Sequence, residues 1–145
     1  MPITINKAKE LNDKMVLQPH WGSAGICRVS TDALEECYEM LNHNYLPPTH
    51  PRVKHYEEHI DERGGNYLPF MVFEMTDKGL GCTFFDGRHT FCVMRDAGLK
   101  EIRVCTEHCR AKIAIENGFE LIPEDEKAER FINEIKEQYN GKKQL

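Results

Sequence analysis

The amino-acid sequence predicts an α+β fold, and three observations lead to this prediction. Apolar residues recur at helical spacing early and late in the chain. Residues 68–85 have the composition of two paired strands, and a further strand-like segment follows at 100–105. The chain has 145 residues, a length that suggests one domain whose core needs no disulfide or metal support.

The first half of the chain is expected to contain two helices. Residues 1–29 show no clear period and are compatible with short strands or an ordered loop. Ser30 can cap a helix over residues 31–42, whose apolar positions follow the spacing of one helical face. A proline-rich break follows, and residues 52–63 then fit a second helix that Gly64 and Gly65 would end.

The second half of the chain alternates between strand and helix patterns. Aromatic and branched residues predict a hairpin over 68–85, with its turn at 76–79. The remaining predictions are helix Arg88–Ala97 ended by Gly98, strand 100–105, helix 107–117 and helix 124–139. The expected order is therefore helix, helix, strand, strand, helix, strand, helix, helix.

The composition restricts the class of protein. The formal net charge is −5, so the chain lacks the overall basic character of a general nucleic-acid binder, although a local basic patch stays open. No apolar run approaches the roughly 18 residues that cross a bilayer, and the first residues lack a signal core. We therefore expect a cytoplasmic protein without a membrane partner, and its six cysteines should be reduced thiols.

The segment FFDGRHT combines groups that suit a negatively charged ligand. Gly87 permits a sharp turn from the strand into a helix, and the first turn of a helix offers unpaired amides with a positive dipole. Arg88 adds a fixed positive charge, His89 a proton that can be exchanged, and Thr90 a hydroxyl. Asp86 could cap the helix, bind a cation or accept a proton. The alternative is a capped helix with surface polar residues.

The stretch FFDGRHTFCVMRDAGLKEIRV resembles the signature segment of the ParB/sulfiredoxin-like superfamily, often labelled the ParB-like nuclease domain. In that superfamily a strand ends in Asp-Gly or a similar pair, and a helix, an Ala-Gly step and a further strand follow. The upstream stretch HPRVKHYEEHIDERGGNYLPFMVF is similar to the family's N-P-R step, helix, glycine and strand. The resemblance implies a small mixed sheet flanked by helices. It divides a single domain, residues 1–145, into a core at about 47–106, an N-terminal extension at 1–46 and a C-terminal helical part at 107–145.

The resemblance also implies a ligand, because members of the superfamily seat a nucleotide or phosphate group at the start of this helix. They include CTP-hydrolysing partition proteins, sulfiredoxins, free-serine kinases and domains labelled as nucleases. When the family's functional positions are transferred to this sequence, the resemblance implies that five residues contact the phosphate: Gly87, Arg88, His89, Thr90 and Arg52. It assigns Mg²⁺ binding to Asp86, and proton transfer to His89, Asp86 or, by analogy with the kinases, Glu57 or its neighbour Glu58.

This sequence departs from the superfamily pattern in three ways. Thr90 stands where relatives carry a phosphate-binding arginine. Arg88 stands where the sulfiredoxin reaction needs a cysteine, which excludes sulfiredoxin activity. The residues after the core are too few for the DNA-binding region of partition proteins, so partition-complex function is not expected.

Two other clusters suggest metal binding, and for both we favour a reading without metal. The run CTEHC at 105–109 offers three ligands, but a structural zinc site needs a fourth, so we expect no structural zinc. His55 and His59 lie four residues apart, a spacing that suits metal binding. Tyr56 stands where a zinc protease needs glutamate, so solvated histidines are the default interpretation.

The sequence thus predicts a protein that binds a nucleotide (ATP, ADP or CTP) or another phosphorylated ligand at residues 86–90. Phosphoryl-group chemistry with Mg²⁺, meaning nucleotide hydrolysis, kinase transfer or nuclease action, would extend that function. The alternative is a non-catalytic module that binds DNA or a protein and is encoded by a phage or another mobile element. The last helix either covers the core or forms a homodimer.

Overall fold

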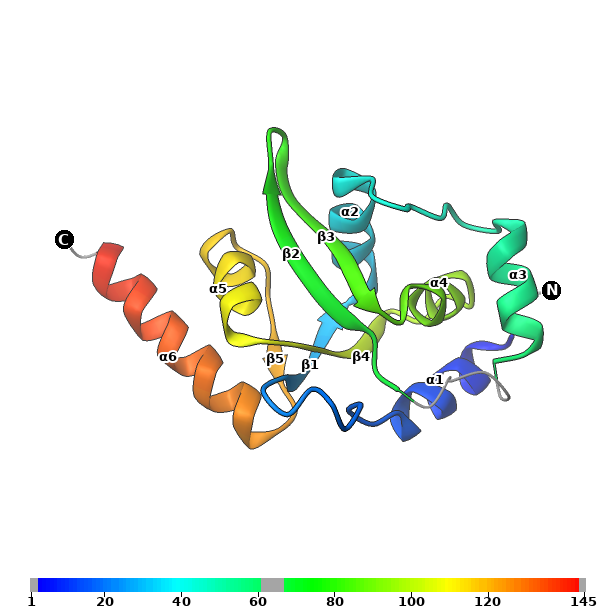
Figure 1. The fold of residues 1–145 in the computed structure, drawn as a ribbon, viewed down its shortest axis with the longest axis horizontal. Helices are drawn as coiled ribbons and strands as arrows, with labels where there is room; N and C mark the ends of the chain where they lie inside the picture. The colour runs from blue at the N-terminus through cyan, green and yellow to red at the C-terminus, as the bar shows by residue number, and fades with distance from the viewer. Residues whose placement is uncertain (1–2, 61–66, 144–145) are drawn as a thin grey trace.

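The computed structural model describes residues 3–60 and 67–143 and confirms the α+β class (Figure 1). The helices are α1 (Ile5–Lys14), α2 (Thr31–Leu41), α3 (Pro51–Glu58), α4 (Arg88–Asp96), α5 (His108–Glu116) and α6 (Glu126–Lys143). The strands are β1 (Gly25–Ser30), β2 (Phe70–Thr76), β3 (Gly79–Asp86), β4 (Glu101–Thr106) and β5 (Ile122–Pro123).

The strands form one mixed sheet in the order β3-β2-β4-β1-β5. The pairs β2/β3, β1/β4 and β1/β5 are antiparallel, and β2 pairs with β4 in parallel at one register position, Phe70 opposite Cys105. Figure 1 shows α5 and α6 on one side of the sheet and α2 and α4 on the other. Both faces of the sheet are therefore covered by helices, as a buried mixed sheet requires.

The helix α2 illustrates how the sequence produces these elements. The Ser30 hydroxyl accepts a hydrogen bond from the Ala33 amide at 3.2 Å, which caps the first turn. Leu34 and Tyr38 are fully buried against the sheet. Asn42 ends the helix in the left-handed conformation, with φ of 54°. The predicted cap and the predicted apolar face are both confirmed.

Three features of the fold differ from the sequence-based expectations or add to them. The sequence-based prediction missed α1, although Thr4 caps its first turn, and it missed β5, which has only two residues. The uninterpreted N-terminal stretch supplies β1, which lies between β4 and β5 inside the sheet. The last helix continues to Lys143. The second helix was predicted to run over residues 52–63, but α3 already ends at Glu58, where His59 leaves the helical conformation at φ of −119°. The glycines Gly64 and Gly65, expected to end it, lie outside the described residues.

The carboxyl end of α4 is fixed by a mostly buried group of charges. The Arg95 guanidinium donates to the Glu35 carboxylate at 3.0 Å, to Asp96 at 3.0 Å and to the Leu46 carbonyl at 2.6 Å. The side chains of Arg95 and Asp96 are only 7% and 4% exposed. Charged hydrogen bonds of this kind are strong where water is excluded, so the network ties α4 to α2 and to the following loop.

All six cysteines are free thiols, and five of them are buried. Burial raises the pKa of Cys37 and Cys92 to about 11 and that of Cys105 to about 12. Thiols with such high pKa values are poor nucleophiles at neutral pH, which fits a packing role. None of the described helices combines the length and apolar character needed to cross a membrane.

Candidate functional site

The predicted strand-turn-helix is present, with Gly87 at its centre. The strand β3 ends at Asp86, and α4 begins at Arg88. Gly87 occupies the N-cap position with φ of 88°, in the left-handed region. Its amide donates to the Asp86 carboxylate at 2.8 Å, and no side chain caps the helix. The first turn of α4 therefore presents backbone amides that an anion can accept hydrogen bonds from.

The turn is pinned closely against the sheet. A Cβ atom on Gly87 would lie 2.6 Å from the Cα atom of Pro69, closer than real Cβ contacts allow. Pro69 is itself held by β4, because its carbonyl accepts the Cys105 amide at 2.9 Å. The position of the helix start is therefore set by the backbone of two neighbouring segments, and only glycine fits there.

The start of α4 carries positive charge from two elements. Arg88 comes from α4 itself, and its buried Nε atom has no hydrogen-bond partner. Arg52 lies in the first turn of α3 and is exposed. Within the part of the chain that the structure describes, neither arginine forms an ion pair with an acidic side chain. The two guanidinium groups are therefore available to a negatively charged ligand.

The two arginines also affect the pKa of His89. Burial, followed by the charges of Arg88 and Arg52, lowers the pKa of its imidazole below the ordinary value. The ring of Tyr56 stacks on it, with 5.2 Å between ring centres and an angle of 25°. His89 is consequently neutral at pH 7, with a fixed orientation, as a group that exchanges a proton needs to be.

Thr90 lies inside the contact between α3 and α4. It is 1% exposed, and its hydroxyl shares a hydrogen bond of 3.3 Å with the Tyr56 hydroxyl. The resemblance implies that this residue faces the ligand, whereas the structure places it beneath the site. It joins the two helices that carry Arg52 and Arg88, so its contribution to a site is positional.

Glu57 lies away from the turn. Burial raises the pKa of its carboxyl, with further contributions from the charges of Asp96 and Glu58, and the Ile3 backbone amide donates to it. Asp96 is the last residue of α4, about 12 Å along the helix axis from Arg88. The structure brings Asp86, Gly87, Arg88, His89 and Arg52 together and does not add Glu57 to them.

An aromatic cavity beside the turn has no counterpart in the sequence-based prediction. Trp21 contacts Phe70 and Phe85 edge-on, with ring centres 4.8 and 5.8 Å apart. The Phe85 side chain, directly before Asp86, is 72% exposed. The cavity measures about 350 Å³ and is lined by His20, Trp21, Ser23, Phe70, Val72, Phe85, Glu107 and Arg110. The sequence did contain a signal for the exposed position of Phe85. Side chains alternate along a strand, so Phe84 and Phe85 must lie on opposite faces of β3.

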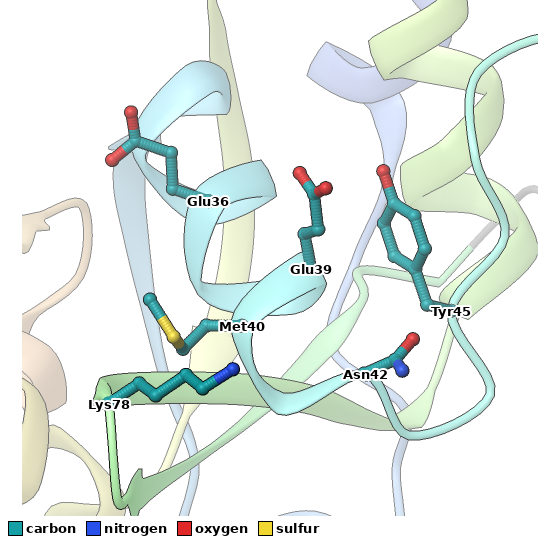
Figure 2. A pocket seen from close by; sticks show the side chains of 6 residues that line it. All are labelled: Glu36, Glu39, Met40, Asn42, Tyr45 and Lys78. Carbon is teal, nitrogen blue, oxygen red and sulfur yellow. The ribbon is translucent and has the colours of Figure 1, made fainter.

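A different hollow, of about 570 Å³, lies at the end of α2 and away from the turn. Figure 2 shows Glu36, Glu39 and Met40 projecting from α2, with Lys78 reaching in from the hairpin and Asn42 and Tyr45 at the other side. Two carboxylates in so open a hollow disfavour an anion, and one lysine does not outweigh them. This hollow does not fit the predicted phosphorylated ligand.

The CTEHC run is divided between the core and the surface. Cys105 is fully buried at the end of β4, whereas His108 and Cys109 are exposed on α5. The Cys109 thiol contacts the Glu107 carboxylate at 3.4 Å. Its three candidate ligands therefore do not share one face of the protein.

Comparisons with known proteins support the fold. The chain is similar to the crystal structure of the Oncogenic Suppression Activity Protein, a plasmid fertility inhibition factor, solved as a gold(I) cyanide derivative. The TM-score is 0.54 at 15% sequence identity, over 70% of this chain and 61% of that protein. At this identity the similarity shows the fold alone. No family model matches the sequence, and no curated protein matches it at a significant level.

Proposed function

We propose that this protein is a member of the ParB/sulfiredoxin-like superfamily that binds a nucleotide or another phosphorylated ligand at the start of α4. One observation carries the proposal: Arg52 and Arg88 flank a helix start without a side-chain cap, and neither is neutralised by a described acidic side chain. Amides, a helix dipole and two guanidinium forks are the groups that proteins use for phosphate.

The same residues fit phosphoryl-group chemistry as an extension of binding. Arg88 and the amides of the first turn would stabilise charge that develops on a phosphoryl group. Neutral His89 would move a proton. Asp86 is exposed and supplies one carboxylate, which suffices for Mg²⁺ when the phosphates of the ligand provide further oxygens. Bound Mg²⁺ would neutralise phosphate charge.

Thermal unfolding in the presence of nucleotides tests the proposal. We expect at least one ligand of a small panel to raise Tm, because a ligand that binds the folded state stabilises it. The panel is ATP, ADP, CTP, GTP and inorganic pyrophosphate, each with and without Mg²⁺. Absence of a shift with every ligand would reject the phosphate site and leave the binding-module alternative.

Replacing Arg88 or Arg52 by alanine is expected to weaken binding of the effective ligand about tenfold or more, since each removes charged hydrogen bonds. The affinity can be measured by isothermal titration calorimetry. Arg130→Ala, which removes an exposed arginine of α6, is the matched control and should bind as the unaltered chain does. Equal affinities for all variants would place the site elsewhere.

Affinity should also depend on pH through His89. An anion beside the ring favours the imidazolium, so binding raises the lowered pKa and takes up a proton. Affinity should therefore increase as the pH falls below about 6.5, the ordinary imidazole value. His89→Gln should remove this increase. The affinity of the unaltered chain, divided by that of His89→Gln at each pH from 5 to 8, is independent of the titration of the ligand itself. If this ratio stays constant with pH, His89 does not face the ligand.

A DNA- or protein-binding module is the second candidate. The solved structure that resembles this chain belongs to a plasmid fertility inhibition factor. The exposed Phe85 and the partly buried Trp21 form an aromatic patch that a partner can cover. Gel-shift and plasmid-nicking assays with a panel of divalent metals test the DNA branch. Unshifted and intact DNA under all conditions would leave a protein partner as the remaining form of this candidate.

A further inference from the structure

The last turn of α3 brings three metal-binding side chains together. One ligand atom each from His55, Glu58 and His59 lies within 4.8 Å of the other two. The two imidazole rings are 5.2 Å apart between centres, at an angle of 66°. His55 and Glu58 lie three residues apart on one face of α3. His59 is the C-cap residue that directly follows the helix and completes the cluster.

We propose that His55, Glu58 and His59 bind one Zn²⁺ ion. Two neutral imidazoles and a carboxylate are the donor set of many zinc sites with an open fourth position. Ligand atoms around tetrahedral zinc lie about 3.3 Å apart, given zinc–nitrogen distances of about 2.0 Å. Closing the present arrangement therefore takes only modest side-chain rotation. His55 and Glu58 are exposed and free to make it, while the half-buried His59 provides the more fixed ligand.

The carboxylate distinguishes this cluster from a mere pair of surface histidines. Glu58 lies between the two rings in the sequence and reaches the same point in space. It supplies a negative charge that offsets half of the charge of the ion. The sequence shows two histidines four residues apart. The structure adds that the Glu58 carboxylate lies close to both of them, which makes a site with three ligands.

Zinc at this position would hold the helix that carries part of the phosphate site. The ion would link residues 55, 58 and 59 across one turn and oppose fraying at the carboxyl end of α3. The same helix carries Arg52 and the Tyr56 hydroxyl that contacts Thr90. The zinc site does not depend on the proposed nucleotide binding, because none of its ligands belongs to the α4 turn.

Calorimetric titration of the tag-free, metal-stripped full chain with ZnCl₂ tests the inference. We expect one saturable site. His55→Ala and Glu58→Ala each remove a direct ligand and should each weaken zinc binding by about 100-fold or more, beyond the roughly 10–100-fold that loss of an outer-sphere partner costs. His43→Ala, which removes an exposed histidine outside the cluster, should leave it unchanged. Because Cys109 is an exposed thiol beside His108, Cys109→Ser is the second control and should also leave it unchanged.

Thermal unfolding gives an independent measurement. Zinc should raise the Tm of the unaltered chain and of His43→Ala, and should have no such effect on His55→Ala. His59→Ala can disturb the fold, because His59 ends the helix, so the two exposed ligands decide the matter. Three outcomes would each overturn the inference. They are zinc binding of unaltered strength in His55→Ala and Glu58→Ala, loss of zinc binding in Cys109→Ser, and absence of saturable binding to the unaltered chain.

Discussion

Replacing Arg95 with leucine is expected to lower the free energy of unfolding by about 3 kcal/mol. The change leaves the carboxylates of Glu35 and Asp96 and the Leu46 carbonyl without their shared donor in a mostly buried place. Urea unfolding followed by circular dichroism measures the loss. It should be larger at pH 8 than at pH 5: burial already raises the pKa of Glu35, and this carboxyl can take up a proton at the lower pH.

Arg28 provides the matched control for this prediction. It also pairs with a carboxylate, that of Glu124 at 2.7 Å, but the two side chains are 34% and 27% exposed. Water therefore weakens their attraction and solvates either partner when the other is lost. Arg28→Leu should cost less than about 1 kcal/mol. A loss for Arg95→Leu as small as that for Arg28→Leu would show that the network at the end of α4 does not anchor the helix.

Replacing Gly87 with alanine is the second change with a large expected effect, about 3 kcal/mol of unfolding free energy. The left-handed backbone at φ of 88° costs a side chain about 1–2 kcal/mol. The added Cβ would also meet the Pro69 backbone at 2.6 Å, which forces the turn and the sheet apart. Urea unfolding measures the stability, and pyrophosphate titration shows whether the displaced helix start still binds phosphate.

Gly118 separates the two causes. It has φ of 82°, almost the same backbone conformation, but nothing lies within 4 Å of an added Cβ. Gly118→Ala should therefore cost about 1 kcal/mol, the backbone contribution alone. If both variants lose the same stability, the close approach of Pro69 to Gly87 is relieved by small shifts and does not fix the turn.

The parts of the fold that the sequence predicted are those with a strong local pattern. The helix α2 has a cap and an apolar face, and the hairpin has two runs of aromatic and branched residues around a turn. The helix α1 also has a cap, since the Thr4 hydroxyl accepts the Lys7 amide at 3.1 Å, but the buried residues within it are only Ala8 and the polar Asn12. Its Asn12 side chain exchanges hydrogen bonds with the backbone of Arg103, at 2.8 and 3.1 Å. A single-sequence pattern does not contain that contact.

The candidate site likewise has a part that the sequence predicted and a part that it did not. The turn at Asp86 and Gly87 is predictable, because a strand pattern, an Asp-Gly pair and a helix pattern follow each other directly. The burial of Thr90 under Tyr56 depends on how α3 packs on α4. The separation of Glu57 from the turn has the same cause, and so does the meeting of Trp21 with Phe85. These are tertiary contacts between segments whose order in the sequence does not reveal their distance in space.

The central position of β1 has a consequence for how the chain is made. Both strands that border it, β4 and β5, lie more than 70 residues further along the chain. The amide that begins α2, that of Thr31, likewise donates to the Lys100 carbonyl. During synthesis β1 therefore leaves the ribosome while its partner strands are still untranslated. Docking of β1 must wait until β4 emerges, and the sheet is completed only when nearly the whole chain is available.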